Sequence, residues 1–440
     1  MKRILLFGAG KSATGLIEYL GNCCDQNNWA FIVCDTNLFL AAFKTKNFKS
    51  TSLIHIDINN EEKRHELISA ADIVISMLPP GLHFLVAKDC VLFSKSFLTA
   101  SYLDEEIKSL RNEIEQKGLF FLGEMGLDPG IDHMSAMKLI DHIKKEGGKI
   151  TSLKSHCGGL VSPESDDNPW HYKITWNPAN VVRAGSSGAI YRNEGKNIEI
   201  PYTEIFNDKK NSVDVPSLFP FAWYANRDSL SYIAMYQLGE IETFIRTTLR
   251  YPSFCRGWNK LVKMDFTNIS DYEEIKDCKT FEEWFDLKKK KFLSKNENAD
   301  AAFFNEEFLE QIDYLKIRSR ENIPAVIRHS STLLQYLLEK YLVMKPHDKD
   351  MIIMVHEIEY SVNSQGKKIS SCLIAKGEDP VNTAMAKTVG LPLGIAAKLI
   401  LQKKIQLTGL HIPVISEIYE PVLKELELNG IQFNEETKMI

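Results

Sequence analysis

Residues 2–20 read KRILLFGAGKSATGLIEYL, and their pattern indicates how the first part of the chain folds. Its apolar run ILLF predicts a short buried strand, and the apolar residues after the glycines recur at helical spacing. The turn from Gly8 to Ala13 fits the pattern G-x-G-x-x-G/A. In this pattern Gly8 allows a tight turn, Gly10 lets the backbone approach a pyrophosphate, and the helix start offers free N–H groups to the anion. The stretch therefore predicts a strand, turn and helix that bind a dinucleotide.

The letters GAGKS in the same turn also suggest a phosphate-binding loop of the nucleotide triphosphatases. That motif requires a glycine five residues before Gly10, where this chain has Leu5 in the middle of the strand. The alternative therefore fails. We assign to the cofactor the residues of the turn, Gly8, Gly10, Lys11, Ser12 and Ala13.

The second predicted strand, WAFIVCD, ends at Asp35. A carboxylate at this place accepts hydrogen bonds from the ribose hydroxyls of NAD and repels the 2′-phosphate of NADP. The next basic residue, Lys44, follows well past the turn. The sequence therefore favours NAD over NADP, with the alternative that Asp35 only starts the loop after its strand.

Further apolar runs predict four more strands, SLIHIDI, ADIVISMLPP, SFLTASY and LFFLGEMG, with helical segments between them. Strands that alternate with helices indicate a parallel, doubly wound sheet of Rossmann type, in which ligands bind beyond the carboxyl ends of the strands. Asp57 lies near the end of the third strand, on the adenine side. Ser101 and Tyr102 follow the fifth strand, so we expect them to face the nicotinamide.

Residues 123–134, GEMGLDPGIDHM, follow the sixth strand and combine three glycines with several polar side chains. The glycines let this loop come close to cofactor and substrate, and Pro129 stiffens the turn after Asp128. We expect Asp128 to face the reaction. Asp132 is expected to cap the helix that follows, next to His133.

The composition is that of a soluble globular protein, with 44% hydrophobic and 25% charged residues in 440. A formal net charge of -5 gives no basic footprint for nucleic acid. The sequence shows no apolar run long enough to cross a bilayer, no secretory leader and no Cys/His metal spacing among its eight cysteines. We therefore expect a cytoplasmic protein with reduced thiols, no metal and no membrane partner, and we interpret Lys288–Lys291 as a solvated helix face.

The rest of the chain changes in texture after the first domain. Residues 1–134 and 380–440 are expected to form the Rossmann domain, with the C-terminal segment packing back on it. Residues 135–229 and 346–379 are expected to form a mixed α/β domain that ends in a hairpin with a Ser-Gln-Gly turn. Residues 230–345 are charge-rich and nearly free of strand patterns, so we expect a helical subdomain.

Several runs together resemble a known family. They are GAGKSA, VISMLPP, TASYLDEE, GEMGLDPGIDHM, HCGGLVSPESDDNPWHYKITWNP, NRDS, TLRY and TAMAKTVGLP. Through them the chain resembles the glutamate-forming saccharopine dehydrogenases, also called saccharopine reductases, over nearly its full length. The resemblance implies a Rossmann domain, a mixed α/β substrate domain and a small helical domain. It also implies oxidation of the C–N bond of saccharopine to an imine, which hydrolyses to glutamate and 2-aminoadipate 6-semialdehyde, or the reverse, with NAD or NADP.

The family's site residues carry over by position. The resemblance implies catalytic roles for Asp128, Tyr102 and Cys157, although Cys157 also reads as a small buried residue. It implies substrate contacts for Ser101, Tyr102, Asp128, Arg227, Thr248, Leu249 and Arg250. Arginine suits the three carboxylates of saccharopine because its planar fork matches a carboxylate. Further cofactor contacts are assigned to Thr36, Asp57, Ile58, Leu78, Leu127, Pro129 and Thr175.

The chain departs from the family pattern at a few places. His156 stands where Tyr is usual, Val161 and Ala225 replace prolines, and Asp35 stands where NADP-using fungal relatives carry Arg. Two alternative functions remain open: a related amino-acid or polyamine C–N dehydrogenase, and a nucleotide-binding scaffold without catalysis. The sequence leaves the direction of the reaction open, and also whether the chain forms a homodimer.

Overall fold

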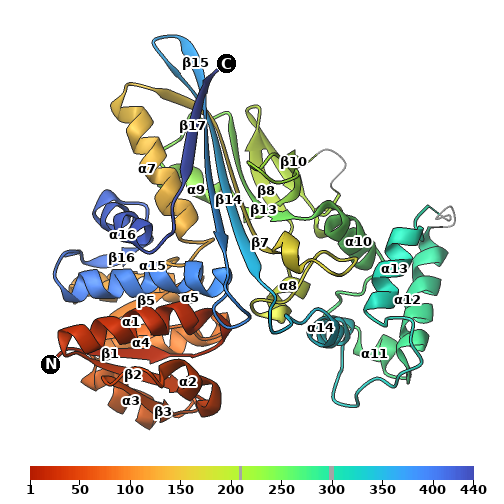
Figure 1. Ribbon diagram of the computed structural model, residues 1–440, viewed down its shortest axis with the longest axis horizontal. Coiled ribbons are helices and arrows are strands. Elements are labelled where there is room, and N and C mark those ends of the chain that lie inside the picture. The colour runs from red at the N-terminus through yellow and green to blue at the C-terminus, as the bar shows by residue number, and fades with distance from the viewer. Residues whose placement is uncertain (208–210, 297–301) are drawn as a thin grey trace. The chain divides into compact units, whose positions relative to one another are not determined.

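The computed structural model describes residues 1–207, 211–296 and 302–440 (Figure 1). The chain forms two compact units, each with a sheet of its own. Unit 1 contains Met1–Gly147 and Val381–Phe433, and unit 2 contains Gly148–Pro380 and Asn434–Ile440. Parts of the predicted substrate and helical domains, residues 208–210 and 297–301, lie outside the described residues.

Unit 1 is built on a seven-stranded sheet in the order β16-β6-β5-β4-β1-β2-β3, and all neighbours in it are parallel. The strands are β1 (Arg3–Phe7), β2 (Ala30–Asp35), β3 (Thr51–His55), β4 (Ile73–Ser76), β5 (Ser96–Thr99), β6 (Phe120–Leu122) and β16 (Gly409–His411). The chain order reverses between β1 and β4, which is the point where doubly wound sheets bind ligands. The predicted Rossmann sheet is confirmed, and the C-terminal segment adds β16 to its edge.

Helices link these strands and cover the sheet of unit 1. They are α1 (Thr14–Asn27), α2 (Leu38–Thr45), α3 (Glu61–Ala70), α4 (His83–Leu92), α5 (Glu105–Ser109), α6 (Arg111–Gln116), α7 (Ile131–Lys145), α15 (Ala384–Leu401) and α16 (Ser416–Leu428). In Figure 1, α15 lies along α1. A Cβ on Gly390 of α15 would lie only 2.4 Å from the backbone nitrogen of Leu16 in α1, so the two helices are in backbone contact.

Among the described residues α15 is the one helix that is long and apolar enough to cross a membrane, a run that the sequence analysis does not predict. Of its 18-residue window, 78% is buried inside the structure. Such burial is typical of a core helix, whereas a membrane-spanning helix can have the same length and composition.

Unit 2 is built on a mixed ten-stranded sheet with the main order β10-β11-β13-β7-β14-β15-β17. Its strands are β7 (Lys149–Val161), β8 (Ala189–Asn193), β9 (Lys196–Ile200), β10 (Ser212–Val213), β11 (Phe221–Ala225), β12 (Arg227–Asp228), β13 (Thr243–Arg250), β14 (Asp350–Val362), β15 (Gln365–Lys376) and β17 (Asn434–Met439). β7 and β13 are parallel, and the predicted hairpin is β14–β15. Its turn is Asn363-Ser364, one residue earlier than expected, with positive φ at both residues as a type I′ turn requires.

Three boundaries differ from the sequence prediction. β13 lies inside the sheet between β11 and β7, although residues 230–345 were expected to be nearly strand-free. The helix α7, assigned in part to the second domain, belongs to unit 1. The last strand, β17, pairs with β15 in unit 2, because its backbone completes the edge of that sheet.

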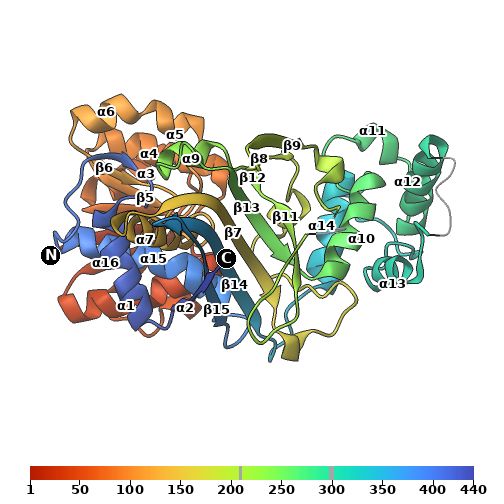
Figure 2. The same cartoon turned by 90° about the horizontal axis from the view of Figure 1, so that it is seen from above.

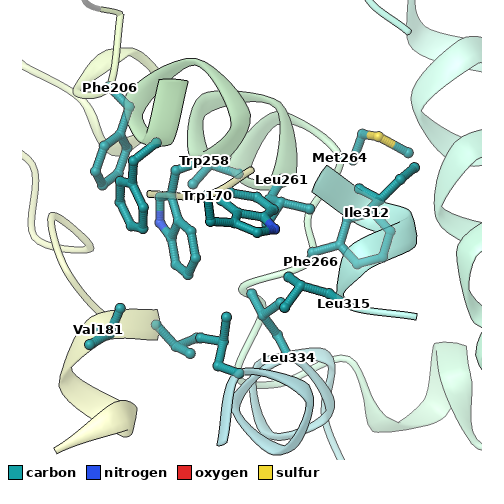
Figure 3. Packing of buried hydrophobic residues seen from close by; sticks show 14 of the residues in the cluster. Trp170, Val181, Phe206, Trp258, Leu261, Met264, Phe266, Ile312, Leu315 and Leu334 are labelled. Carbon is teal, nitrogen blue, oxygen red and sulfur yellow. The ribbon is translucent and has the colours of Figure 1, made fainter. Parts of the chain in front are cut away.

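The helices of unit 2 are α8 (Pro178–Val182), α9 (Ser231–Met235), α10 (Pro252–Lys263), α11 (Tyr272–Ile275), α12 (Phe281–Lys295), α13 (Glu306–Tyr314) and α14 (Ser330–Tyr341). Of these, α10 to α14 lie together beside the strands β8 to β11 (Figure 2). Aromatic and aliphatic side chains from α8, α10, α13 and α14 fill one apolar cluster around Trp170 and Trp258 (Figure 3). The helical segment thus shares its core with the sheet instead of forming a separate compact unit.

Candidate functional site

The glycine turn of unit 1 lies where the sequence predicts it, directly after β1. Gly8 has φ +98°, and a Cβ there would lie 2.7 Å from the carbonyl oxygen of Met77, at the end of β4. Only glycine fits here, because the backbone segments that follow β1 and β4 come so close together. A Cβ on Gly10 would meet nothing within 4 Å, so the outer side of the turn is open. Lys11–Ala13 form a 3-10 turn before α1, in which Ala13 is buried.

Asp35 ties the end of β2 to the glycine turn. Its two carboxylate oxygens accept hydrogen bonds from the backbone N–H groups of Ala9, at 2.6 Å, and Asn37, at 2.7 Å. Lys44 of α2 donates to the carbonyl oxygens of Ala9 and Gly10 at 2.9 and 2.5 Å. Burial lowers the pKa of Lys44 to about 8, and the charge of Asp35 works against this effect. A carboxylate at the turn fits the hydroxyls of a ribose, so the residues present fit a nicotinamide dinucleotide.

The other predicted cofactor residues are spread over the loops of both units. Thr36 and Asp57 are exposed. Asp57 lies two residues past the end of β3 and accepts a hydrogen bond from the N–H of Asn59. Ile58 and Leu127 are buried, and Leu78 is half-buried. Pro129 is buried and follows a cis peptide bond. Thr175 is buried in unit 2.

The loop between β6 and α7 folds tightly on itself. Two backbone hydrogen bonds close the loop: the N–H of Gly126 donates to the carbonyl oxygen of Pro129, and the N–H of Ile131 donates to the carbonyl oxygen of Gly126. Gly130 has φ +145°, and a Cβ there would lie 2.1 Å from the carbonyl oxygen of Gly126. This close approach explains one of the glycines that the sequence places in the loop.

Asp132 does not cap α7 in the way the sequence predicts. The residue at the N-cap is Gly130, and Asp132 lies inside the first turn of the helix. Asp132 is not the N-cap because the helix already begins at Ile131. Its carboxylate instead accepts a hydrogen bond from the N–H of Gly130 at 2.6 Å. His133 is fully buried, with Nε2 3.0 Å from the carboxylate of Glu124.

The reactive side chains predicted in unit 1 do come together. The hydroxyl of Tyr102 donates to Oδ1 of Asp128 at 3.2 Å, and both side chains are half-buried. The neighbouring Ser101 contacts His83 at 2.8 Å, between its Oγ and Nε2. These residues follow the carboxyl ends of β4, β5 and β6, which is the edge where a doubly wound sheet binds its ligands.

In unit 2, Arg250 ends β13 and is 4% exposed. Its Nη1 donates to the carbonyl oxygen of Leu249 at 2.8 Å, and its Nε has no hydrogen-bond partner. The guanidinium carbon lies 5.3 Å from the ring centre of Tyr172 and 5.6 Å from that of Phe254. Within the described part of the chain no carboxylate forms an ion pair with Arg250, although a buried charge normally requires one.

Two other predicted residues share the sheet face of Arg250. Cys157, on β7, is paired in register with Thr248, on β13, and Thr248 is paired with Tyr224 on β11. Strand residues two apart point to the same face, so Thr248 and Arg250 do so. Leu249 points to the other face, where it packs in an apolar cluster, so only its backbone is available on the face of Arg250. Arg227 is exposed, on the short strand β12.

Sequence reasoning missed several residues around these groups. Tyr172 and Tyr224 are buried beside Arg250, and burial raises the pKa of the Tyr224 hydroxyl while the charge of Arg250 opposes it. His83 and Ser76 were missed in unit 1. No local pattern distinguishes these residues, because strand pairing or a loop connection brings them to the site.

A cluster of three carboxylates, Asp265, Asp271 and Glu274, has the spacing of a metal site. The ammonium of Lys288 occupies its centre, at 3.1, 2.7 and 3.2 Å from the three carboxylates in that order. The side chain of Lys288 is fully buried, so the interpretation of Lys288–Lys291 as a solvated face is wrong at this residue. The cation that balances these carboxylates is part of the chain itself.

Comparison with known proteins identifies the family. Residues 4–122 match the model of the saccharopine dehydrogenase NADP binding domain, and residues 126–431 match that of the saccharopine dehydrogenase C-terminal domain. The second match covers more than half of the chain. The chain belongs to the saccharopine dehydrogenase family. It is therefore assigned to a family of NAD(P)-dependent oxidoreductases, as the sequence predicts.

Individual relatives agree with this assignment. The chain is 32% identical to alpha-aminoadipic semialdehyde synthase of Arabidopsis thaliana, over 99% of this chain and 45% of that protein. It is 30% identical to the saccharopine dehydrogenase [NADP(+), L-glutamate-forming] of Schizosaccharomyces pombe, over 99% of both chains. The chain thus spans about half the length of the plant relative and nearly all of the yeast one.

A solved structure shows the same fold. The apo saccharopine dehydrogenase (L-Glu forming) of Saccharomyces cerevisiae matches with a TM-score of 0.87 and 29% sequence identity, over 100% of both chains. This likeness shows that the two chains share one fold over their full length.

Proposed function

We propose that this member of the saccharopine dehydrogenase family oxidises saccharopine and releases glutamate and 2-aminoadipate 6-semialdehyde. At the C–N bond of saccharopine the carbon loses a hydride and the nitrogen loses a proton, and water then splits the resulting imine. The nicotinamide of a bound NAD(P) supplies the hydride acceptor for this chemistry. The names of the yeast relatives and the residues of the two sheets support the proposal.

The observation that carries the proposal is the buried guanidinium of Arg250. A charged group that is 4% exposed and forms no ion pair within the described residues is costly unless a ligand brings the opposite charge. Saccharopine carries three carboxylates, and arginine binds a carboxylate through two parallel hydrogen bonds. The unpaired Nε of Arg250 leaves such a donor available.

Proton transfer requires a second group, and Asp128 is the candidate. Its carboxylate accepts a hydrogen bond from Tyr102, which fixes the orientation of one oxygen. A carboxylate held in this way can accept a proton from the substrate amine or from the water that attacks the imine. We assign Tyr102 the role of orienting this carboxylate, and Cys157 that of a small residue on the face of Arg250.

Steady-state kinetics with saccharopine and NAD or NADP tests the proposal. Replacement of Arg250 by Gln removes the charge and keeps a hydrogen-bond donor. The loss of a buried charged hydrogen bond costs about 2–5 kcal/mol, so the KM for saccharopine should rise by roughly 30-fold or more while the KM for the cofactor stays nearly unchanged. Arg256→Gln, in the nearby helix α10, removes an exposed arginine paired with Glu307 and serves as the matched control.

Two results would contradict the assignment. If Arg250→Gln raised the KM values of cofactor and saccharopine equally, Arg250 would not be a substrate contact. If the wild-type protein bound the dinucleotide but reduced none of it with saccharopine, the related C–N dehydrogenases and the non-catalytic scaffold would become the leading alternatives.

For the cofactor we propose a preference for NAD. Asp35 places a full negative charge beside the glycine turn, where the 2′-phosphate of NADP would approach, and Lys44 is engaged by the carbonyls of Ala9 and Gly10. Two yeast relatives are named as NADP(+)-dependent, so the proposed preference for NAD would distinguish this chain from them. Asp35→Asn keeps an acceptor for the N–H of Ala9 but removes the charge. We expect it to lower the ratio of the Kd values for NADP and NAD by about tenfold or more, equivalent to 1.4 kcal/mol, in a calorimetric titration. An unchanged ratio would show that Asp35 does not discriminate.

A further inference from the structure

Three side chains of unit 1 form a hydrogen-bonded series at the carboxyl edge of its sheet. Ser76, the last residue of β4, places its Oγ 2.7 Å from Nδ1 of His83. His83, the first residue of α4, places Nε2 2.8 Å from Oγ of Ser101. Ser76 and His83 are almost fully buried, at 0% and 1% exposure, and Ser101 is half-buried. Both nitrogens of the imidazole are therefore engaged by hydroxyl groups.

His83 is neutral at physiological pH. Burial lowers its pKa to about 4, although the charge of Asp104 opposes this effect. A neutral imidazole has one N–H donor and one acceptor nitrogen, so one of the two serines donates to it and the other accepts from it. The direction of the series decides what the outer hydroxyl, that of Ser101, can do.

The burial of Ser76 selects the direction. A buried hydroxyl proton without an acceptor costs about 1–3 kcal/mol. In the part of the chain that the structure describes, the Oγ of Ser76 has Nδ1 of His83 as its only hydrogen-bond partner. Its O–H therefore donates to Nδ1. The proton of the imidazole then resides on Nε2, and this N–H donates to Ser101.

Ser101 is thereby left with its own proton. Its Oγ accepts from His83 and has no second partner among the described residues. A hydroxyl that accepts one hydrogen bond in this way donates its proton to the next acceptor. The residue that follows, Tyr102, donates to the carboxylate of Asp128, so two neighbouring hydroxyls at this edge of the sheet act as donors.

We propose that His83 is a positioning residue that fixes Ser101 as a hydrogen-bond donor to a carboxylate oxygen of the substrate. The proposal rests on the proposed function for the identity of that substrate. The orientation of the series itself does not depend on it. A purely structural role, in which His83 only fastens the loop between β4 and α4, predicts no link between His83 and the behaviour of Ser101.

The tautomer is measured first, in the protein without substrate. Histidine-selective 15N labelling and long-range proton–nitrogen correlation spectra give the protonation state of each ring nitrogen, and the loss of one signal set in His83→Gln assigns the resonance. We expect the Nε2–H tautomer at pH 7 and no second ring proton down to pH 5.5. In Ser76→Ala, Nδ1 loses its donor, and the preference for Nε2–H should weaken. An Nδ1–H tautomer in the wild-type protein would overturn the proposal.

Kinetics then test the coupling of His83 to Ser101. Ser101→Ala should raise the KM for saccharopine by roughly 10- to 100-fold, the effect of one hydrogen bond to a charged group. His83→Leu should have the same effect, and the double variant should be no worse than either single variant. His83→Gln places an amide N–H where Nε2 lies and should recover most of the loss. Additive effects of the two substitutions, or a His83→Gln variant as impaired as His83→Leu, would overturn the proposal.

The two parts of the experiment separate the possible failures. An Nε2–H tautomer combined with no turnover of saccharopine by the wild-type protein refutes the proposed function and leaves the orientation of the series intact, because the spectra require no substrate. Circular dichroism of each variant detects loss of folding. If His83→Leu is unfolded, the kinetics of His83→Gln and Ser101→Ala, together with the proton–nitrogen correlation spectra, still test the proposal.

Discussion

At the scale of single residues, the most informative finding is that one lysine of a charged run is a core residue. Lys288 is fully buried between Asp265, Asp271 and Glu274, whereas Lys290, two residues later, is exposed. Burial alone would lower the pKa of Lys288, but the hydrogen bond and charges of its carboxylate partners outweigh this and raise it. Lys288→Met should reduce the free energy of unfolding by roughly 3–5 kcal/mol, because it leaves the buried Asp271 without its counter-ion.

Urea unfolding followed by tryptophan fluorescence measures this loss, and Lys290→Met is the control, with an expected change below about 0.5 kcal/mol. The pH dependence adds a second criterion. Lys288 and Ser330 hold the pKa of Asp271 low against the effect of burial, so in the wild-type protein Asp271 stabilises the fold above its ordinary pKa and loses this effect on acidification. In Lys288→Met the unpaired carboxylate is unfavourable until it is protonated. The difference in the free energy of unfolding between variant and wild type should therefore narrow as the pH falls. A constant difference would argue against a stabilising ion pair between Lys288 and Asp271.

At the scale of elements, the contact between α1 and α15 sets the position of the glycine turn, because α1 begins directly after it. Gly390 of α15 lies against the backbone of Leu16. Alanine is a better helix former than glycine by about 1 kcal/mol, so helix propensity predicts that Gly390→Ala stabilises the protein. Overpacking predicts the opposite, a loss of about 1–3 kcal/mol, since the obstacle is backbone. We expect the loss, and a weaker affinity for the dinucleotide, in thermal unfolding and calorimetric titration. Gly81→Ala, with nothing within 4 Å of the added Cβ, is the control.

The elements also show how far the sequence reaches. The strands β1 to β6 of unit 1 were predicted because each is a short apolar run next to turn residues, a signal confined to the strand itself, whereas β16 was not predicted as a strand. β13 was missed because its sequence, TFIRTTLR, mixes threonines and arginines with apolar residues, and these polar groups are buried only through pairing with β7 and β11. The same holds for the site: Gly8, Asp128 and Arg250 follow from motifs, whereas His83 and Lys288 acquire their roles from partners distant in the sequence.

At the scale of the whole molecule, each of the two units contains a buried histidine whose pKa is lowered by burial. His83 lies in unit 1 with a pKa of about 4, and burial also lowers the pKa of His156 in unit 2, against the influence of Glu357. His156 is fully enclosed, with Nδ1 2.7 Å from the hydroxyl of Thr247 and Nε2 3.4 Å from the carboxylate of Glu357. The stability of both units should therefore fall in mild acid, in unit 1 because of His83 and in unit 2 because of His156.

The sign follows from proton binding. A histidine in the unfolded chain has a pKa near 6.5, so it binds a proton as the pH falls below this value. In the folded unit the histidine does not yet bind this proton, because its pKa is lower. The free energy of unfolding should fall on acidification from pH 7 toward pH 4.5, by up to about 1.4 kcal/mol per pH unit for each histidine. His156→Tyr should remove the part that belongs to unit 2 and leave that of unit 1 unchanged. Hydrogen exchange of the strands β14 and β1, measured by mass spectrometry at pH 7 and 5, reports the two units separately. The exposed His55, replaced by Tyr, is the control. Equal acid sensitivity of β14 in wild type and His156→Tyr would show that another group governs the stability of unit 2.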